Sequence, residues 1–262
     1  MSGAKVRFTV FTKPWKMPIA ELGKFIHNLG FDGIELPVRP GYPVTPENVT
    51  KGLPEAKKIL ADCGVRISTI AGGTDERTIA ACAASGVPII RICVEIPKEK
   101  TYLAGVSDLQ KEWDKSVPIL DKHGVAIGVQ NHCGRCIANA MQLLHAVGKY
   151  NPKHICAVWD AAHNGLEGEQ VDLALDTIWS HLRLVNLKSA YWKRTSGPEA
   201  PVAQWQVYWT TGRHGRSNWP SVAEELKKRG YSGDICLTAE YSDEHAVDRL
   251  IAEDIAYAKS LF

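Results

Sequence analysis

The chain alternates between short, nearly continuous apolar runs and longer stretches in which apolar residues recur with helical spacing. Runs without a polar face are typical of parallel strands that are covered on both sides. We expect eight such strands, at Arg7–Phe11, Gly33–Leu36, Arg66–Ile70, Ile89–Val94, Ala126–Gln130, Ile155–Trp159, Leu182–Leu187 and Ile235–Ala239. Between the first two, Ile19, Leu22, Ile26 and Leu29 form one apolar helix face. The pattern predicts repeated strand–helix units.

A glycine often separates a helical stretch from the strand that follows it, as at Gly30, Gly64, Gly86, Gly124 and Gly230. Glycine suits the left-handed position that ends a helix because it has no Cβ to clash. Helix, glycine and apolar strand in regular succession are typical of parallel βαβ units. Eight repeats favour an α/β fold, a single (β/α)8 TIM barrel, and leave an open doubly wound sheet as the alternative.

Length and organisation indicate one domain over residues 1–262, because 262 residues is the usual size of a closed α/β barrel and no linker interrupts the chain. Residues 191–218 depart from the strand–helix rhythm, since they are rich in Trp, Gly and Arg and are weakly periodic. We expect a long rim loop there, because such a loop in a compact domain usually forms a lid or an insertion. Its tryptophans could also shape a homo-oligomer interface.

Charge and composition exclude several classes of protein. Lys and Arg total 31 and Asp and Glu total 29, and the net charge of +2 gives no reason to expect nucleic acid or a membrane as partner. No apolar stretch approaches the ~20 residues of a membrane span, and no signal peptide is visible. The seven cysteines suit reduced thiols in the cytoplasm better than disulfides. Cys133 and Cys136 form a lone CxxC, which favours a structural role over a zinc site because no second pair exists.

Polar residues close most of the apolar runs. They are Glu35, Glu95, Gln130, His132, Asp160, His163, Asn186, Lys188 and Glu240. In a (β/α)8 barrel the strand ends meet at one rim, where the active site lies. Charged groups in apolar strands are costly unless they are paired, hydrated or metal-bound. Several at one rim therefore predict a functional site there.

Over nearly the whole chain, these strand ends resemble the xylose-isomerase-like barrels, a superfamily of sugar isomerases, epimerases and inosose dehydratases related to endonuclease IV. The matching stretches are Gly33–Leu36, Val129–His132, Trp159–His163, Val185–Lys188, Gly215–Trp219 and Ala239–Tyr241. The resemblance implies an isomerase, epimerase or dehydratase acting on a keto-sugar or an inosose-like polyol. The implied step is proton abstraction next to a carbonyl.

The resemblance also implies a divalent metal held by Glu, Asp, His and Glu at the ends of the last four strands. These positions fall on Gln130, Asp160, Asn186 and Glu240, so two of the four expected ligands are replaced by amides. Two carboxylates and two amide oxygens would suit Mn²⁺, Mg²⁺ or Ca²⁺ rather than Zn²⁺. Gln130 cannot take a proton, so a two-base epimerase mechanism does not carry over. No organic cofactor is expected.

Four residues are the candidates for catalysis. Glu240 is the leading acid/base, because a carboxylate near a metal or buried in a cleft can have its pKa tuned for proton removal. His163 or His132 is the partner acid, and His163 also matches a substrate-side or metal-side histidine of the family. Lys188 is placed to stabilise an enolate.

Six residues are candidate substrate contacts: Glu35, Glu95, Trp15, Trp192, Arg194 and His214. Tryptophans offer a flat apolar face to a sugar ring, as would Trp205 and Trp209 in the same segment as Trp192. Several of the six have structural alternatives, since the tryptophans can instead hold the long loop in place or face another subunit. Glu35 can close a salt bridge inside the barrel, and Glu95 can pair with Arg91 or Lys98.

Other functions remain open at this stage. Gln130 and Asn186 favour a catalytically inactive barrel that binds a sugar or a protein partner. Lys188 would also suit a Schiff-base aldolase, because lysines at barrel strand ends can act as nucleophiles. A nuclease related to endonuclease IV is disfavoured by the near-neutral charge and by too few strand-end histidines for several zinc ions.

Overall fold

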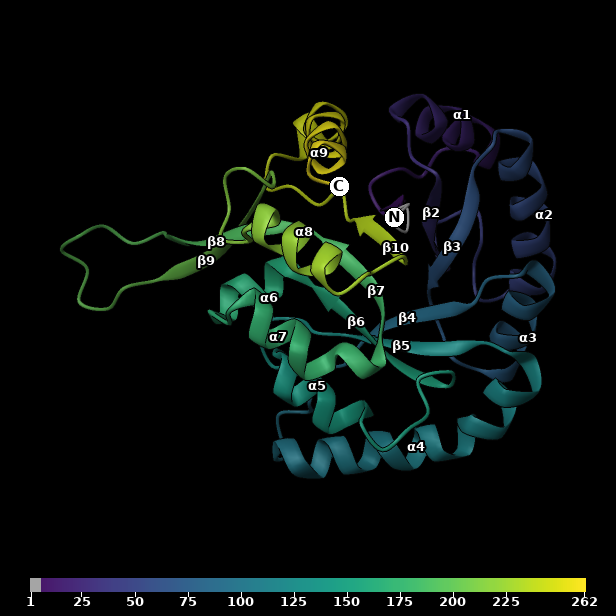
Figure 1. The fold of residues 1–262 in the computed structure, drawn as a ribbon, viewed down its shortest axis with the longest axis horizontal. Helices are drawn as coiled ribbons and strands as arrows, with labels where there is room; N and C mark the ends of the chain where they lie inside the picture. The colour runs from purple at the N-terminus through teal and green to yellow at the C-terminus, as the bar shows by residue number, and fades with distance from the viewer. Residues whose placement is uncertain (1–5) are drawn as a thin grey trace.

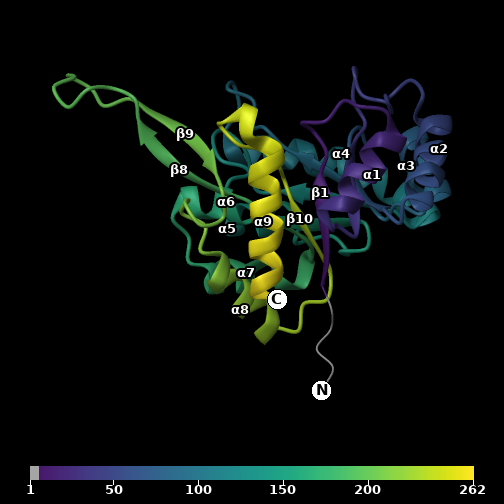
Figure 2. The same ribbon diagram turned by 90° about the horizontal axis from the view of Figure 1, so that it is seen from above.

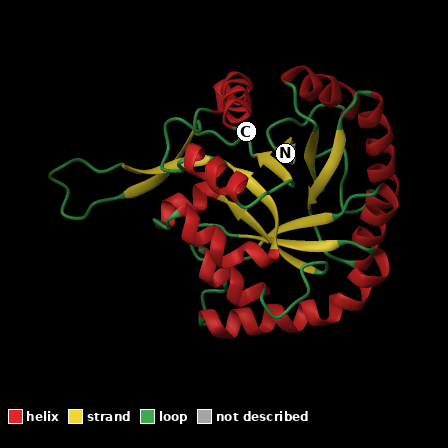
Figure 3. Ribbon diagram, viewed as in Figure 1, coloured by secondary structure: helices red, strands yellow, loops and turns green. Residues whose placement is uncertain are grey.

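The chain is represented by a computed structural model that describes residues 6–262. The barrel strands are β1 (Arg7–Phe11), β2 (Gly33–Pro37), β3 (Arg66–Ala71), β4 (Ile89–Cys93), β5 (Ala126–Gln130), β6 (Ile155–Asp160), β7 (Leu182–Leu187) and β10 (Asp234–Leu237). They are all parallel and close in the order β1-β10-β7-β6-β5-β4-β3-β2 (Figures 1 and 3). The closed (β/α)8 barrel is confirmed, and the open sheet is excluded.

Helices cover the outside of the barrel (Figure 2). They are α1 (Ile19–Leu29), α2 (Val49–Asp62), α3 (Glu76–Ser85), α4 (Tyr102–His123), α5 (Ala140–Val147), α6 (Ala161–Glu167), α7 (Val171–Ile178), α8 (Trp219–Lys228) and α9 (Val247–Leu261), with short 3-10 turns at Trp179–His181 and Glu244–Ala246. Gly30 ends α1 with a left-handed φ of 83°, as the helix–glycine pattern predicts. Within residues 6–262, no helix has the length and apolar character needed to cross a membrane.

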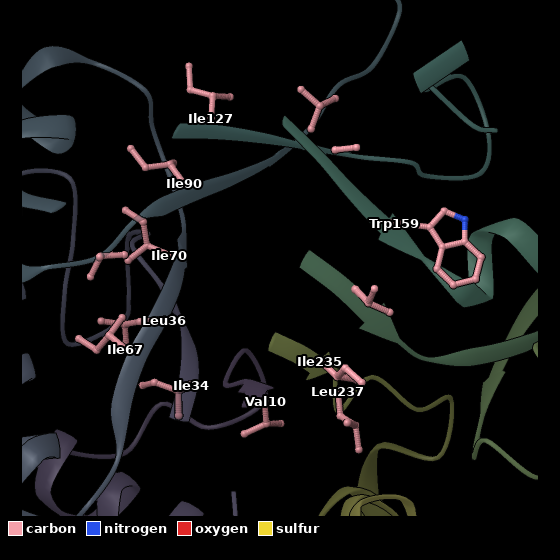
Figure 4. Close-up of a cluster of buried hydrophobic side chains, with 14 of the residues drawn as sticks. Val10, Ile34, Leu36, Ile67, Ile70, Ile90, Ile127, Trp159, Ile235 and Leu237 are labelled. Carbon is pink, nitrogen blue, oxygen red and sulfur yellow. The ribbon is translucent and has the colours of Figure 1, made fainter. Parts of the chain in front are cut away.

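The buried apolar residues form one large cluster and three smaller ones. Strand residues such as Val10, Ile34, Ile90 and Ile127 join helix residues in one continuous apolar cluster between the strands and the helices (Figure 4). A smaller cluster is formed by Phe11, Ala71, Val158, Leu184 and Cys236, which come from five of the barrel strands. The strands are therefore apolar toward two sides, which explains why their runs show no polar face.

A two-stranded antiparallel hairpin projects from the barrel, within the segment expected to be a rim loop (Figures 1 and 2). Its strands are β8 (Ser189–Arg194) and β9 (Trp205–Thr210). Ala190 at the base of the hairpin packs against Leu166 of α6. Trp205 at the outer end of the hairpin is 57% exposed. The hairpin thus follows β7 and extends from the barrel rim.

Candidate active site

Glu35 lies inside the barrel and is paired with Arg91 of β4. The Arg91 Nε lies 3.0 and 3.1 Å from the two carboxylate oxygens, and an Nη donates to Oε1 as well. The Thr69 hydroxyl donates to Oε2 over 3.1 Å. Glu35 was expected to contact substrate, but its carboxylate is buried and accepts hydrogen bonds from these donors. The structure therefore agrees with the alternative role, a salt bridge inside the barrel.

Asp160 ends β6 and caps α6. Its Oδ1 accepts hydrogen bonds from the backbone N–H groups of Ala162 and His163, at 2.9 and 3.2 Å. Its Oδ2 accepts from Nε2 of Gln130 over 2.9 Å. Burial raises the pKa of Asp160, while the Lys188 ammonium opposes the rise. Both oxygens of this fully buried carboxylate are therefore satisfied by protein donors.

Glu240 is held between two ammonium groups. The Nζ of Lys188 donates to Oε2, and the Nζ of Lys13 donates to Oε1. Burial opposes ionisation, yet the attraction of Lys188 and Lys13 prevails and holds the pKa of Glu240 well below its ordinary value. A general acid needs the opposite shift. The preceding Ala239 is the one non-glycine residue within residues 6–262 whose φ is positive, at 49°, a strain that commonly accompanies functional sites.

Trp209 at the end of β9 lies over this charge cluster. The Lys188 Nζ is 3.5 Å from the centroid of its indole ring, a cation–π distance. The edge of the same indole meets His163, with ring centroids 5.3 Å apart at 72°. Beside it opens a groove of ≈ 580 Å³, to whose lining Lys13, Trp209 and Glu240 all contribute. The hairpin thereby supplies an aromatic wall to the barrel mouth.

His132 and His163 stack on each other, with ring centroids 4.0 Å apart and tilted by 33°. The Nδ1 of His132 lies 2.9 Å from the carbonyl oxygen of Cys133, and the N–H of Cys133 donates to Nδ1 of His163 over 3.0 Å. Burial first, and then the nearby Lys188, hold the pKa of His163 well below its ordinary 6.5. His163 is therefore neutral at physiological pH.

Polar atoms without a partner within residues 6–262 remain near these groups. Both side-chain atoms of Asn186 are buried without a hydrogen bond, as are the hydroxyls of Thr9 and Thr238 and the Nε2 of His163. Asn186 stands beside Asp160 in the β6–β7 register and beside Cys236 in the β7–β10 register. Buried polar atoms are rarely left unpaired, so these atoms are exceptions within the described residues.

Two other predicted substrate contacts lie away from this cluster. Trp15 is only 7% exposed, and its Nε1 donates to Asp248 over 2.7 Å, so its ring packs in the core and offers no open face. Glu95 is exposed, and within the described residues it pairs with neither of the cations considered, because Arg91 is engaged by Glu35. Its role in substrate binding stays a prediction.

The remaining three predicted contacts lie on or beside the hairpin. Trp192 is half-exposed and donates to the carbonyl of Leu166 over 3.3 Å. Arg194 is turned toward the tip, where an Nη donates to the carbonyl of Gly197 over 3.0 Å. His214 is exposed after the hairpin and bonds Thr211 through Nδ1 at 2.8 Å. None of these contacts joins the Glu240 cluster.

Lys13 was not among the site residues expected from the sequence, although it follows the first barrel strand as the other candidates follow their strands. The same rule, that polar residues after apolar strands face the rim, would have found it. Trp209 was considered only as one of several loop tryptophans. Its position over Lys188 depends on the hairpin register, in which it pairs with Ala190.

The four predicted metal ligands do not fit a divalent cation. Both oxygens of Glu240 are taken by ammonium groups, and both oxygens of Asp160 by N–H donors. Gln130 turns its nitrogen, not its oxygen, toward Asp160, and its Oε1 accepts from the Cys93 thiol at 3.5 Å. Only Asn186 keeps free donor atoms. A site that already holds two cationic side chains repels a third positive charge.

His132, Cys133 and His163 form a second group, whose ligand atoms lie within 4.8 Å of one another. A histidine that binds metal through Nε2 normally donates its Nδ1–H to an acceptor. His163 does the reverse, because its Nδ1 accepts the N–H of Cys133. This group does not fit a metal either, and Cys133 and Cys136 are both free thiols.

The family description "xylose isomerase-like TIM barrel" matches residues 24–261, and the chain belongs to this family. A comparison with curated proteins finds no match.

Similar solved structures cover almost the whole chain. D-psicose 3-epimerase from Clostridium cellulolyticum H10 has a TM-score of 0.71 at 14% identity, over 98% of this chain and 99% of that chain. The 3-keto-D-glucoside 4-epimerase from E. coli has a TM-score of 0.73 at 13% identity, over 98% and 100%. The probable 3-DHS dehydratase AsbF from Bacillus anthracis has a TM-score of 0.72 at 13% identity, over 97% and 99%. At these identities the likeness shows a shared fold, and the neighbours are epimerases and a dehydratase.

Proposed function

We propose that the protein is an enzyme of the isomerase, epimerase or dehydratase type that removes a proton next to the carbonyl of a keto-sugar or an inosose-like polyol. The family and the activities named for the similar structures support this class of substrate. The observation that carries the proposal is the buried Lys188 ammonium, held by Glu240 at the barrel mouth beside uncommitted polar atoms.

Lys188 supplies the charge that this chemistry needs. Removing a proton next to a ketone places negative charge on the carbonyl oxygen, and a fixed cation in a water-poor site stabilises it. The side chain of Lys188 is 5% exposed, and Glu240 and the Trp209 ring hold its ammonium in place. The resemblance to the family implies a divalent ion as the group that stabilises this negative charge. Here the cation is part of the chain, so the proposed reaction needs no added metal.

The substrate class follows from the free polar groups. The amide of Asn186 and the hydroxyl of Thr238 offer both donors and acceptors without protein partners within residues 6–262. The Trp209 indole provides an apolar face at the same mouth. A few convergent polar groups beside an aromatic wall suit a polyhydroxylated ring or chain.

Two alternatives receive less support. A Schiff-base aldolase needs a free amine as nucleophile, whereas the Nζ of Lys188 is engaged in an ion pair with Glu240. An inactive binding barrel would bind the same sugars without exchanging their protons. Borohydride trapping tests the first alternative, and the exchange experiment below tests the second.

The experiment incubates the protein with ketohexoses, 3-ketoglucosides and inososes in D2O and follows deuterium entry next to the carbonyl by NMR. We expect exchange with at least one class, at the same rate after exhaustive chelation and after addition of Mn²⁺ or Mg²⁺. Exchange that disappears on chelation and returns with metal would contradict the metal-free mechanism. Binding without exchange across the panel would contradict catalysis.

A further inference from the structure

A second cavity opens at the barrel rim, where β2, β3 and β4 end. Its volume is ≈ 350 Å³, and its lining includes Val38, Arg39, Gly72, Gly73, Arg91 and Cys93. Among the described residues no acidic side chain lines it, so both of its charged side chains are arginines. Whether the cavity attracts an anion therefore depends on what already neutralises these two guanidinium groups.

The two arginines differ in this respect. Arg91 is neutralised by the buried carboxylate of Glu35, to which it donates through Nε and an Nη. Arg39 is half-buried, and within residues 6–262 its guanidinium has neither a salt bridge nor a hydrogen bond. A charge that is partly removed from water is costly without a counter-ion. Arg39 is therefore a cation that a bound anion would stabilise.

The ring of Phe11 shows that the Arg39 guanidinium lies over the inside of the barrel. Phe11 packs in one cluster with residues of β3, β6, β7 and β10, which it can reach only from within the barrel. The guanidinium carbon of Arg39 lies 5.6 Å from the centroid of this ring, and that of Arg91 lies 4.6 Å from it. The cation–π contact holds Arg39 above the barrel interior instead of on the outer surface.

Hydrogen bonds connect this cavity with the candidate active site on both sides. The exposed Cys93 thiol donates to Oε1 of Gln130 over 3.5 Å, and Nε2 of Gln130 donates to Asp160 over 2.9 Å. On the other side, the carbonyl oxygen of Arg39 accepts from the N–H of Tyr42 over 3.2 Å, and Tyr42 lines the groove of ≈ 580 Å³ described above. The cavity and the candidate active site therefore belong to one barrel mouth.

The carboxylate of Asp75 lies beside this cavity but does not neutralise Arg39. It is close to Gly73, where a Cβ would lie 3.2 Å from Oδ2. Asp75 caps α3, since Oδ1 accepts the N–H of Thr78 over 3.2 Å and Oδ2 accepts the Thr78 hydroxyl over 2.7 Å. Arg77 lies 4.0 Å from the same carboxylate. The positive charge of Arg39 therefore remains available to a ligand.

We propose that Arg39 binds an anionic oxygen group of the substrate, a carboxylate or a phosphate, so that the enzyme acts on an acidic keto-sugar in preference to a neutral one. The inference rests on the proposed function and names the substrate class of the same mouth. A guanidinium presents paired N–H donors that match two oxygens of a carboxylate or a phosphate. The anionic group would lie in the cavity of Arg39, and the carbonyl of the same molecule would face Lys188.

Anion binding can be measured without turnover, by isothermal titration calorimetry with inorganic phosphate, D-glucuronate and D-glucose. We expect wild-type protein to bind at least one of the two anions more tightly than glucose, and the tighter anion identifies the group as phosphate or carboxylate. Arg39→Gln is expected to weaken that binding by about 10- to 100-fold, the range of a hydrogen bond to a charged group. Arg39→Lys keeps the charge without the paired donors, so an intermediate affinity is expected.

Two further variants locate the anion. Arg249→Gln removes an exposed cation of α9 that pairs with Glu253, and it is the matched control with an expected wild-type affinity. Lys16→Gln removes an exposed cation of the neighbouring groove and is expected to retain most of the binding. No anion binding by the wild type, equal binding by folded Arg39→Gln, or a loss confined to Lys16→Gln would overturn the proposal.

The substrate class is tested by the D2O exchange described above, with D-fructose 6-phosphate and 5-keto-D-gluconate compared with D-fructose. We expect one of the acidic sugars to exchange at least about tenfold faster than fructose, and Arg39→Gln to remove this advantage. Equal exchange of neutral and acidic sugars would overturn the inference and leave the proposed function intact. If no sugar exchanges while anion binding depends on Arg39, the proposed function fails and the assignment of Arg39 as an anion-binding residue stands.

Discussion

The guanidinium of Arg91 and the carboxylate of Glu35 meet inside the barrel, with Nε 3.0 and 3.1 Å from the two oxygens. Arg91 also lies 4.6 Å from the centroid of the Phe11 ring. The two side chains come from β4 and β2, on either side of β3, and both are buried. The pair thus links β2 to β4 across β3, and each buried charge is compensated by the other.

Removing one member of this pair is expected to destabilise the protein. Glu35→Gln leaves the Arg91 charge buried without compensation, so the free energy of unfolding should fall by about 3–5 kcal/mol. Replacing both, in Glu35→Leu/Arg91→Met, should recover much of that loss. Urea denaturation measures both. A Glu35→Gln protein of wild-type stability that fails only in substrate binding would instead support the role expected from the sequence.

Removal of the Lys188 charge is expected to abolish most of the exchange activity. Lys188→Met keeps the length of the side chain but not the cation, and losing one electrostatic stabiliser typically costs about 10²–10³ in rate. The rate of deuterium entry into the active keto-sugar measures the effect. Lys111→Met, on the outer surface of α4, is the control. A Lys188→Met enzyme of normal rate would refute the electrostatic role.

The indole ring of Trp209 is expected to contribute to kcat/KM. Trp209→Ala removes the face that contacts the Lys188 ammonium, and a desolvated cation–π contact of ~2 kcal/mol corresponds to roughly a 30-fold change. The loss should appear in kcat/KM, and Trp209→Phe should restore part of it. Trp205→Ala at the outer end of the hairpin should have no effect. Equal losses in both alanine variants would point to the hairpin as a whole.

Asp254 of α9 predicts a pH dependence of stability. Burial raises its pKa to about 6, although it accepts from the N–H of Gly212 and the Tyr241 hydroxyl. Because the folded form binds the proton more tightly than the unfolded form, folding takes up a proton between the unfolded pKa of 3.8 and 6. Stability from this group is therefore greatest below that window and decreases as the pH rises through it, by about 3 kcal/mol in total.

The Asp254→Asn variant isolates this contribution, since Asn stays neutral at every pH. The difference in melting temperature between wild type and variant should shift in favour of the wild type as the pH is lowered from 7 to 4.5. Asp172→Asn, an exposed acid on α7, should leave the pH profile unchanged. A difference that does not vary with pH would contradict the raised pKa.

The strands could be predicted from the sequence because burial on both sides leaves a continuous apolar signal. β1, β5 and β7 have the expected bounds. β10 ends at Leu237, before the expected Ala239, because Ala239 leaves the extended conformation with its φ of 49°. The hairpin gave no such signal, since most residues of β8 and β9 are partly or fully exposed and do not alternate with a buried face.

The sequence indicated which residues gather at the barrel rim better than it indicated the contacts between them. The rule that rim residues follow apolar strands identified Asp160, His163, Lys188 and Glu240. It could not show that Glu240 is neutralised by lysines, because that pairing depends on which strands become neighbours. The contacts that the Cys133 peptide group makes with His132 and His163 were equally out of reach.

The contact between Lys13 and Glu240 joins residues separated by 227 positions, across the pairing of β1 with β10. This is one of the longest loops the chain can close, and such non-local contacts form late in folding because the entropy of closure must be overcome first. Lys188, Glu240 and Lys13 can therefore assemble only when the last strand has joined the first. The cluster of Lys13, Lys188 and Glu240 is therefore complete only in a chain whose first and last barrel strands have paired.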